Sequence, residues 1–319
     1  MFILNPPYVS NLLAETIKKN HYKVLINKEA EKLGNYDGII SEKEAKEEAK
    51  NNNCFKLYTN SEDSVEWILQ NLNDTDIPEK LNLFKDKIKF RELLKPLYPD
   101  FYYKAVSLVD LKSLNPKELK YPCILKPAIG FLSFGVYPVH DSKEFKKVIS
   151  NIDKDINDFK GVFPLEVVDT SMFLIEEMIL GDEYAIDAYF NCKGEAVILN
   201  IFHHPFLNEN DVTDRVYYTS KNIIESYLDK FESLLNKIGK SAGLKNFPMH
   251  LELRMQGEKM IPIEINPMRF AGWCDTDVAY YAYGINMYEY YMEDKKPDWT
   301  KILDSKGEEM YYFTGAEIS

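Results

Sequence analysis

The 319-residue chain is poor in cysteine and has no long apolar run. Its four cysteines, Cys54, Cys123, Cys192 and Cys274, lie far apart and include no Cys-x-x-Cys pair. This spacing suggests neither a disulfide framework nor a zinc site, so we expect reduced, buried thiols. No apolar stretch reaches the roughly 20 residues of a membrane span, and no signal-peptide pattern opens the chain. We therefore expect a soluble, cytoplasmic protein without a membrane partner.

Basic residues are also too few for a nucleic-acid-binding surface. Lys and Arg number 39 against 51 Asp and Glu, which gives a formal net charge of -12. A protein that binds nucleic acid needs a basic face, so we expect no such partner. The 22 Tyr and 18 Phe argue against disorder. The length predicts two domains, or one domain with lobes.

A Gly-x-Gly motif is missing as well, and this absence decides how Asn5-Pro6-Pro7-Tyr8 is interpreted. The tetrapeptide resembles the catalytic loop of amino-methyltransferases. In those enzymes it follows a strand and a Gly-x-Gly loop that bind the methyl donor, whereas here only a short apolar segment precedes it. We therefore interpret it as a turn in which the prolines end the first strand and Ser10 caps the first helix.

Strand-like and helix-like segments alternate through the first part of the chain, which predicts a small parallel α/β domain over residues 1–84. Residues 85–170 contain a linking helix and then mixed short strands and helices. From residue 171 the pattern is mainly β, interrupted by one long helix that we expect to end at Gly243. These shifts predict three regions, 1–84, 85–170 and 171–319.

The first segment with chemical potential is an apolar strand that ends in Lys126-Pro127 and leads into a loop with Gly130, Ser133 and Gly135. Glycines let a backbone approach phosphate closely, and the loop N–H groups can point at the anion. The lysine adds a positive charge. A plain β-hairpin with a glycine turn explains the same residues equally well.

The second segment contains acidic residues around a strand break. Alternation places Glu176 and Glu177 on opposite sides of one strand. Gly181 breaks that strand, and Glu183 opens the next one. A carboxylate here could accept hydrogen bonds from ribose hydroxyls, and strand-end backbone groups could contact an adenine edge. The alternative is a hairpin with solvated acids.

The third segment is a predicted hairpin that carries Glu252 on one strand and Glu264 and Asn266 on the next. Residues two apart share a face of a strand, so these three oxygen donors can converge. Hard oxygen ligands suit Mg²⁺, and adjacent buried carboxylates are costly without a cation. Arg269 follows on a loop and is suited to holding a carboxylate or phosphate. An ordinary polar hairpin with a surface arginine is the alternative.

In order and spacing, these segments together resemble the ATP-grasp superfamily. Its pattern is a strand ending in Lys-Pro, a Gly/Ser loop, a hinge with Glu-x-x-x-x-Gly-x-Glu, one Glu on a strand and Glu-x-Asn-Pro on the next. The matching positions are Lys126-Pro127, 130–135, 176–183, Glu252 and 264–267. The resemblance covers about residues 85–280. It implies an α/β protein in which an N-terminal parallel α/β domain precedes a two-lobed ATP-grasp domain of α+β type.

The resemblance also implies a role for each matched residue. The implied nucleotide-binding residues are Lys87, with Lys89 as a rival, and Lys126, Ser133, Gly135, Glu176, Glu177, Ile179 and Glu183. Glu176 would contact the adenine amino group, the backbone of Glu177 and Ile179 would complete the hinge, and Glu183 would bind ribose. The implied ligands of one or two Mg²⁺ ions, with Mn²⁺ as an alternative, are Glu252, Glu264 and Asn266. Lys126 and Arg269 would be catalytic.

Two departures from the family pattern stand out. Phe131, Leu132 and Phe134 occupy a loop in which many members have more glycine, and Met268 separates Asn-Pro from Arg269. His250 lies two residues before Glu252, on the same strand face, where it could contact phosphate or be part of the core.

The implied reaction forms an amide with release of ADP and phosphate. A small-molecule carboxylate attacks the γ-phosphate of ATP, and an amine then captures the acyl phosphate. An ATP-grasp kinase and a non-catalytic nucleotide-binding module are the alternatives.

Several residues outside the matched motifs have no implied role. His203, His204, Asp214 and Arg215 are interpreted as a solvated loop, with a substrate-cleft edge as the alternative. Asp275 or Thr276 is expected to cap a Tyr-rich helix, whose tyrosines could lie in the core or at a homodimer contact.

Overall fold

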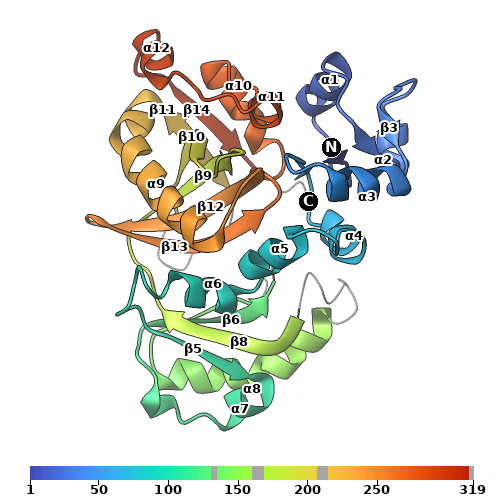
Figure 1. The fold of residues 1–319 in the computed structure, drawn as a ribbon. Coiled ribbons are helices and arrows are strands. Elements are labelled where there is room, and N and C mark those ends of the chain that lie inside the picture. Colours follow the sequence, from blue (N-terminus) through green and yellow to red (C-terminus); the bar gives the residue numbers. More distant parts are fainter. Residues whose placement is uncertain (131–134, 160–168, 207–214, 316–319) are drawn as a thin grey trace. The chain divides into compact units, whose positions relative to one another are not determined.

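The computed structural model describes residues 1–130, 135–159, 169–206 and 215–315, which form two compact units (Figure 1). Unit 1 contains Met1–Leu81, Asp182–Pro205 and the described residues from 215 onward. Unit 2 contains the described residues of Asn82–Gly181 together with Phe206. The chain therefore leaves unit 1 before the small sheet of unit 2 and returns to it at Asp182. No described helix is long and apolar enough to cross a bilayer.

The N-terminal part of unit 1 is a parallel α/β domain, as the alternating pattern predicts. Its four-stranded sheet has the order β3-β2-β1-β4. The strands are β1 (Phe2–Ile3), β2 (Val24–Leu25), β3 (Ile39–Ile40) and β4 (Tyr58–Thr59). The helices are α1 (Asn11–Lys19), α2 (Lys28–Glu31), α3 (Glu42–Asn51) and α4 (Ser64–Asn71). The Ser10 hydroxyl accepts a hydrogen bond from the Leu13 amide at 3.0 Å, which confirms the predicted cap of α1.

Unit 2 is built around a four-stranded antiparallel sheet with the order β5-β8-β6-β7. The strands are β5 (Tyr103–Ser107), β6 (Cys123–Ile129), β7 (Tyr137–Val139) and β8 (Asp169–Glu177). Helix α5 (Ile77–Lys85) crosses the boundary between the units, and α6 (Lys87–Leu94), α7 (Leu108–Ser113), the 3₁₀ turn η1 (Pro116–Glu118) and α8 (Ser142–Phe159) complete the unit.

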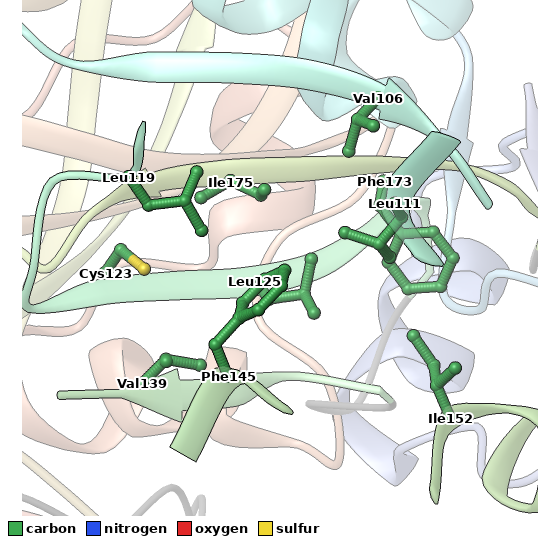
Figure 2. Close-up of a cluster of buried hydrophobic side chains, with 10 residues drawn as sticks. All are labelled: Val106, Leu111, Leu119, Cys123, Leu125, Val139, Phe145, Ile152, Phe173 and Ile175. Atoms are coloured by element: carbon green, nitrogen blue, oxygen red, sulfur yellow. The ribbon is translucent and has the colours of Figure 1, made fainter. Parts of the chain in front are cut away.

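The core of unit 2 lies on one face of this sheet. Leu125, Phe173 and Ile175 project from the strands and meet Phe145 and Ile152 of α8 (Figure 2). Because strand residues alternate between the two faces, Lys126, Leu174 and Glu176 project from the other face. Burial of the apolar face against α7 and α8 therefore determines which side chains the opposite face presents.

The larger sheet of unit 1 is antiparallel and has the order β13-β12-β9-β10-β11-β14. Its strands are β9 (Asp182–Phe190), β10 (Ala196–His204), β11 (Val216–Ser220), β12 (Phe247–Gln256), β13 (Lys259–Pro267) and β14 (Met310–Thr314). The helices of this part are α9 (Lys221–Ala242), the 3₁₀ turn η2 (Asp275–Asp277), α10 (Val278–Tyr283), α11 (Met287–Met292) and α12 (Trp299–Asp304). The expected fold class, α/β with antiparallel sheets after a parallel domain, is confirmed.

Helix α9 packs on the face of this sheet that carries Tyr184. The rings of Tyr227 and Phe231 lie 4.5 and 5.7 Å from the Tyr184 ring. The helix ends at Gly243, whose φ of 62° is left-handed, so the predicted end of this helix is confirmed. Close packing also explains Gly239, because a Cβ added there would lie 2.1 Å from Cε1 of the buried Phe190.

Two expectations about single residues are wrong. Cys123 is buried, but Cys54 and Cys192 are exposed, because both lie in turns rather than in strands or helices. Neither Asp275 nor Thr276 caps α10, since residues 275–277 form a 3₁₀ turn and the Thr276 hydroxyl donates to the Ala271 carbonyl at 2.9 Å.

The contact at Gly239 yields a stability prediction. Alanine stabilises an ordinary helix position relative to glycine by about 1 kcal/mol. In Gly239→Ala, however, the methyl group meets the Phe190 ring, so we expect the free energy of unfolding to fall by about 1–3 kcal/mol in a urea titration. Ser241→Ala, at an exposed position of the same helix, is the control and should change stability by less than about 0.5 kcal/mol. A more stable Gly239→Ala protein would contradict this packing.

Candidate functional site

The buried carboxylate of Glu176 is the centre of the candidate site in unit 2. Arg91 of α6 donates from Nε to Oε2 at 2.5 Å, and Lys126 of β6 places Nζ 2.6 Å from Oε1. All three side chains are at most 5% exposed. Strands β6 and β8 pair so that Lys126 opposes Leu174 and Ile124 opposes Glu176. The antiparallel register therefore makes Lys126 and Glu176 diagonal neighbours on one face.

A third cationic side chain belongs to this buried cluster. Lys87 is also buried, and its Nζ donates to the Gly130 carbonyl at 2.8 Å. Burial would raise the pKa of Glu176, but Arg91 and Lys126 outweigh burial and lower it to about 2. Burial lowers the pKa of Lys126 despite the attraction of Glu176, and Arg91 and Lys87 lower it further. Lys87, Arg91 and Lys126 thus bring three cationic groups to the same buried region as the Glu176 carboxylate.

Arg91 is a member of this cluster that sequence reasoning missed. It follows Lys87 by four residues, so the two share a face of α6, and this spacing was the available signal. The rival candidate Lys89 lies on a different face. Its side chain is 54% exposed, and its Nζ lies 3.7 Å from Asp86. The structure thus brings Lys87, and not Lys89, to the carbonyl of Gly130.

The loop after β6 is described only in part, and Ser133 lies outside the described residues. Gly135 has a φ of 65°, and a Cβ there would lie 3.0 Å from Cγ of Pro127, so both its conformation and its packing require glycine. At the other end of the site, the Glu177 amide donates to the Tyr102 carbonyl at 2.9 Å. Ile179 is buried in the segment that leads from β8 to β9 and from unit 2 to unit 1.

Glu183 and the histidine pair form a polar group at one end of β9 and β10. The Glu183 carboxylate accepts from Arg254 Nε at 2.9 Å and lies 3.2 Å from His204 Nδ1. His203 Nδ1 lies 2.8 Å from the Tyr218 hydroxyl. The interpretation of His203 and His204 as a solvated loop is wrong, because β10 continues through both residues and His204 is buried. Arg215 is exposed, and Asp214 lies outside the described residues.

The three predicted metal ligands lie together on β12 and β13. Glu252 and Glu264 are direct cross-strand partners, as the hairpin predicts. The Asn266 amide nitrogen lies 3.4 Å from Oε1 of each carboxylate. Rotation of this amide would present its oxygen in place of its nitrogen, and oxygen is the atom that Mg²⁺ binds. Across the described residues no group of three His, Cys, Asp or Glu residues could hold a metal ion.

A buried polar row adjoins these ligands. His250 Nδ1 lies 2.8 Å from Asp187 Oδ1, and its Nε2 lies 3.7 Å from Glu252 Oε1. Since an ionised carboxylate only accepts, Nδ1 of His250 is the donor. Asp187 is fully buried, and the same Oδ1 accepts from the Ala271 amide at 2.8 Å. Asp187 therefore connects the strand of Glu252 to the loop that follows β13. Sequence reasoning missed it, although an aspartate within the apolar run from Tyr184 to Phe190 was a usable signal.

Arg269 is held within unit 1 and is not a surface arginine. Its Nε donates to Glu62 Oε1 at 3.0 Å, and Nη1 donates to the Phe270 carbonyl at 2.9 Å. The side chain is 15% exposed. Burial lowers the pKa of Arg269, but Glu62 and then Glu252 outweigh burial and raise it. Met268, with a φ of 64°, makes the turn that separates Asn266-Pro267 from this arginine.

Comparisons with known proteins show what this chain resembles. A family model described as an ATP-grasp domain matches residues 119–277. A comparison with curated proteins finds no match. Similar solved structures include an L-amino acid ligase from Bacillus licheniformis, with 18% identity, a TM-score of 0.66, and coverage of 92% of this chain and 74% of that one.

Two further structures show the same fold. A biotin carboxylase complex from Campylobacter jejuni has 17% identity and a TM-score of 0.64, and the match covers 96% of this chain and 71% of that one. A phosphoribosylamine–glycine ligase from Thermotoga maritima has 16% identity and a TM-score of 0.64, with coverage of 92% and 74%. At these identities the likeness is one of fold.

The lowered pKa of Glu176 predicts a pH-dependent stability. Its folded pKa of about 2 lies below the ordinary value of 4.5, so the ion pairs contribute fully above pH 4.5, and the contribution falls as the pH decreases towards 2. In urea titrations, Glu176→Gln should have a much smaller free energy of unfolding than the wild type above pH 4.5. The difference in this free energy between the two proteins should decrease towards pH 2. A difference in free energy of unfolding that stays constant with pH would contradict the lowered pKa of Glu176.

Proposed function

Because the chain belongs to the ATP-grasp superfamily, we propose that it is an ATP- and Mg²⁺-dependent ligase that joins a small-molecule carboxylate to an amine and releases ADP. The observation that carries this proposal is the buried group of three cationic side chains, Lys87, Arg91 and Lys126, gathered with Glu176 in unit 2. In this proposal the protein works in the cytoplasm, because the reaction consumes ATP. The L-amino acid ligase and the phosphoribosylamine–glycine ligase are named for joining amino-acid substrates, which supports the same reaction class.

In this proposal the cluster in unit 2 binds the phosphates of ATP. Lys87 and Lys126 offset the charge on the phosphate oxygens, while Arg91 keeps Glu176 ionised and in place. The glycines of the loop after β6, with Ser133, cover the phosphates through backbone N–H groups. Glu176 and the backbone of Glu177 and Ile179 contact adenine.

The residues proposed for ribose and metal come from unit 1. Glu183 is held by Arg254 and His204 with its carboxylate at the start of β9, which suits it to accept hydrogen bonds from ribose hydroxyls.

Glu252, Glu264 and Asn266 fit a magnesium ion, because two adjacent carboxylates and one amide supply hard oxygen donors. When bound, one or two Mg²⁺ ions, or Mn²⁺, would neutralise charge on the transferring phosphate. The adjacent carboxylates repel each other without a cation, so their pairing across β12 and β13 supports this role.

The proposed reaction needs no protein nucleophile. A substrate carboxylate oxygen attacks the γ-phosphorus, and the bond to the β–γ bridging oxygen breaks, so that ADP leaves. The amine then attacks the acyl carbon, phosphate leaves, and the amine loses a proton. In this scheme Arg269, which is held in place by Glu62, binds the carboxylate or the transferred phosphoryl group through its guanidinium group.

A phosphate-release screen tests the function. Mg-ATP is incubated with the protein and pools of amino acids and other carboxylates, each with and without added amines. We expect phosphate release only when an acid and an amine are both present, and mass spectrometry should then detect the conjugate. ADP formation with a hydroxyl compound alone, with the phosphate retained on that compound, would establish a kinase and contradict the proposal.

The metal assignment has its own test. Glu264→Gln and Glu252→Gln each remove one anionic ligand, so we expect the Mg²⁺ concentration for half-maximal turnover to rise by about 10-fold or more. Glu258→Gln is the matched control, since Glu258 is exposed on the turn that joins β12 and β13. It should titrate with Mg²⁺ as the wild type does. Equal metal dependence in Glu264→Gln and Glu258→Gln would rule out the assigned ligands.

A further inference from the structure

The two edges of the six-stranded sheet in unit 1 differ in character. One edge is β13, which contains Pro262 and Pro267 and begins at Lys259. Prolines lack an N–H donor, and lysine at an edge hinders pairing with another chain, so this edge is protected. The other edge is β14, Met310–Thr314, whose sequence Met-Tyr-Tyr-Phe-Thr has no proline and no charged residue. Of the two edges of this sheet, as far as the structure describes them, β14 is therefore the one suited to pairing.

Strand β14 has one strand neighbour in the described part of the chain. All five of its residues pair with β11, from Ser220 opposite Met310 to Val216 opposite Thr314. Met310 and Tyr312 are 53% and 52% exposed. Their exposure on an unprotected edge is unusual for a monomer, because such an edge can add a further strand.

An aromatic row crosses the sheet and ends at this edge. Tyr184, His203, Tyr218 and Tyr312 are successive cross-strand partners on β9, β10, β11 and β14. Their ring centroids lie 5.1, 5.1 and 5.4 Å apart. Tyr312 is the middle residue of β14, so the row leads to the centre of the edge strand, where its last ring is half exposed.

We propose that β14 is a homodimer interface, at which it pairs antiparallel with β14 of a second copy about a two-fold axis through Tyr312. Met310 then opposes Thr314 of the second copy, and Tyr312 opposes its own counterpart. The aromatic row continues from one copy into the other. This proposal does not depend on the proposed function.

A second copy fits this edge better than another partner for two reasons. The five-residue register is self-complementary, and it contains no charge that would face a like charge across the axis. Pairing of the open edge of this sheet with the same edge of a second copy about a two-fold axis gives a closed pair, and closed pairs are the commonest form of soluble oligomers. Helix α10 lies against β14 and exposes Tyr280 and Tyr281, which supply further apolar surface beside the strand.

Sedimentation analysis of three proteins tests the interface. Wild type should sediment at micromolar concentration as a particle of twice 37.2 kDa, and Tyr312→Lys as a particle of 37.2 kDa. Tyr8→Lys is the matched control, because Tyr8 is 51% exposed and lies in the N-terminal domain. It should behave as the wild type does. A monomeric wild type, or a Tyr312→Lys protein that remains dimeric, would overturn the proposal.

Disulfide cross-linking tests the register of the two paired β14 strands, and it does not rely on the Tyr312→Lys variant. The background is Cys54→Ser with Cys192→Ser, which removes the exposed thiols. Directly opposed antiparallel residues have Cα atoms about 4.5–5.5 Å apart, which a disulfide can span. Tyr312→Cys should therefore form a covalent dimer with oxidised glutathione as the oxidant. Met310→Cys should not, because residue 310 opposes residue 314. Failure of Tyr312→Cys to cross-link, or equal cross-linking of Met310→Cys, would contradict the proposed pairing.

Discussion

The carboxylate of Glu176, buried and shared by Arg91 and Lys126, is the interaction on which the candidate site of unit 2 depends. Buried cations repel one another and lose their hydration, so a carboxylate must accompany them. The Glu176 carboxylate stabilises the buried cations that it contacts. The antiparallel pairing of β6 with β8 and the packing of α6 supply these groups from three elements. Under the proposed function, these cationic side chains bind the phosphates of ATP.

Unit 1 uses a buried carboxylate in a comparable way. Asp187 accepts from His250 and from the Ala271 amide, so it fixes both the strand that carries Glu252 and the loop that carries Arg269. Glu62 then holds Arg269 from the N-terminal domain. The proposed metal ligands and the proposed catalytic arginine are therefore positioned by carboxylates that have no chemical step of their own. This arrangement preorganises the site before any substrate binds.

Much of the fold and part of the candidate site could be predicted from local sequence. The other site residues depend on contacts between distant parts of the chain. Alternation and hairpin spacing were enough to place Glu252 beside Glu264, and Gly243 at the end of α9, because these features depend on neighbouring residues. Helical spacing places Arg91 on the same face of α6 as Lys87, but the partners of Arg91 and Glu62 could not be predicted, since they lie 85 and 207 residues away. His203 and His204 were misplaced because the apolar pattern of β10 stops at Phe202, whereas histidine can be buried in a strand when its ring nitrogens find partners.

The most direct test of this account is a crystal structure with Mg²⁺ and a non-hydrolysable ATP analogue. We expect phosphate oxygens on Lys87 and Lys126, adenine beside residues 176–183, and the metal on Glu252, Glu264 and Asn266. Adenine bound elsewhere, or a metal ion away from these three ligands, would contradict it.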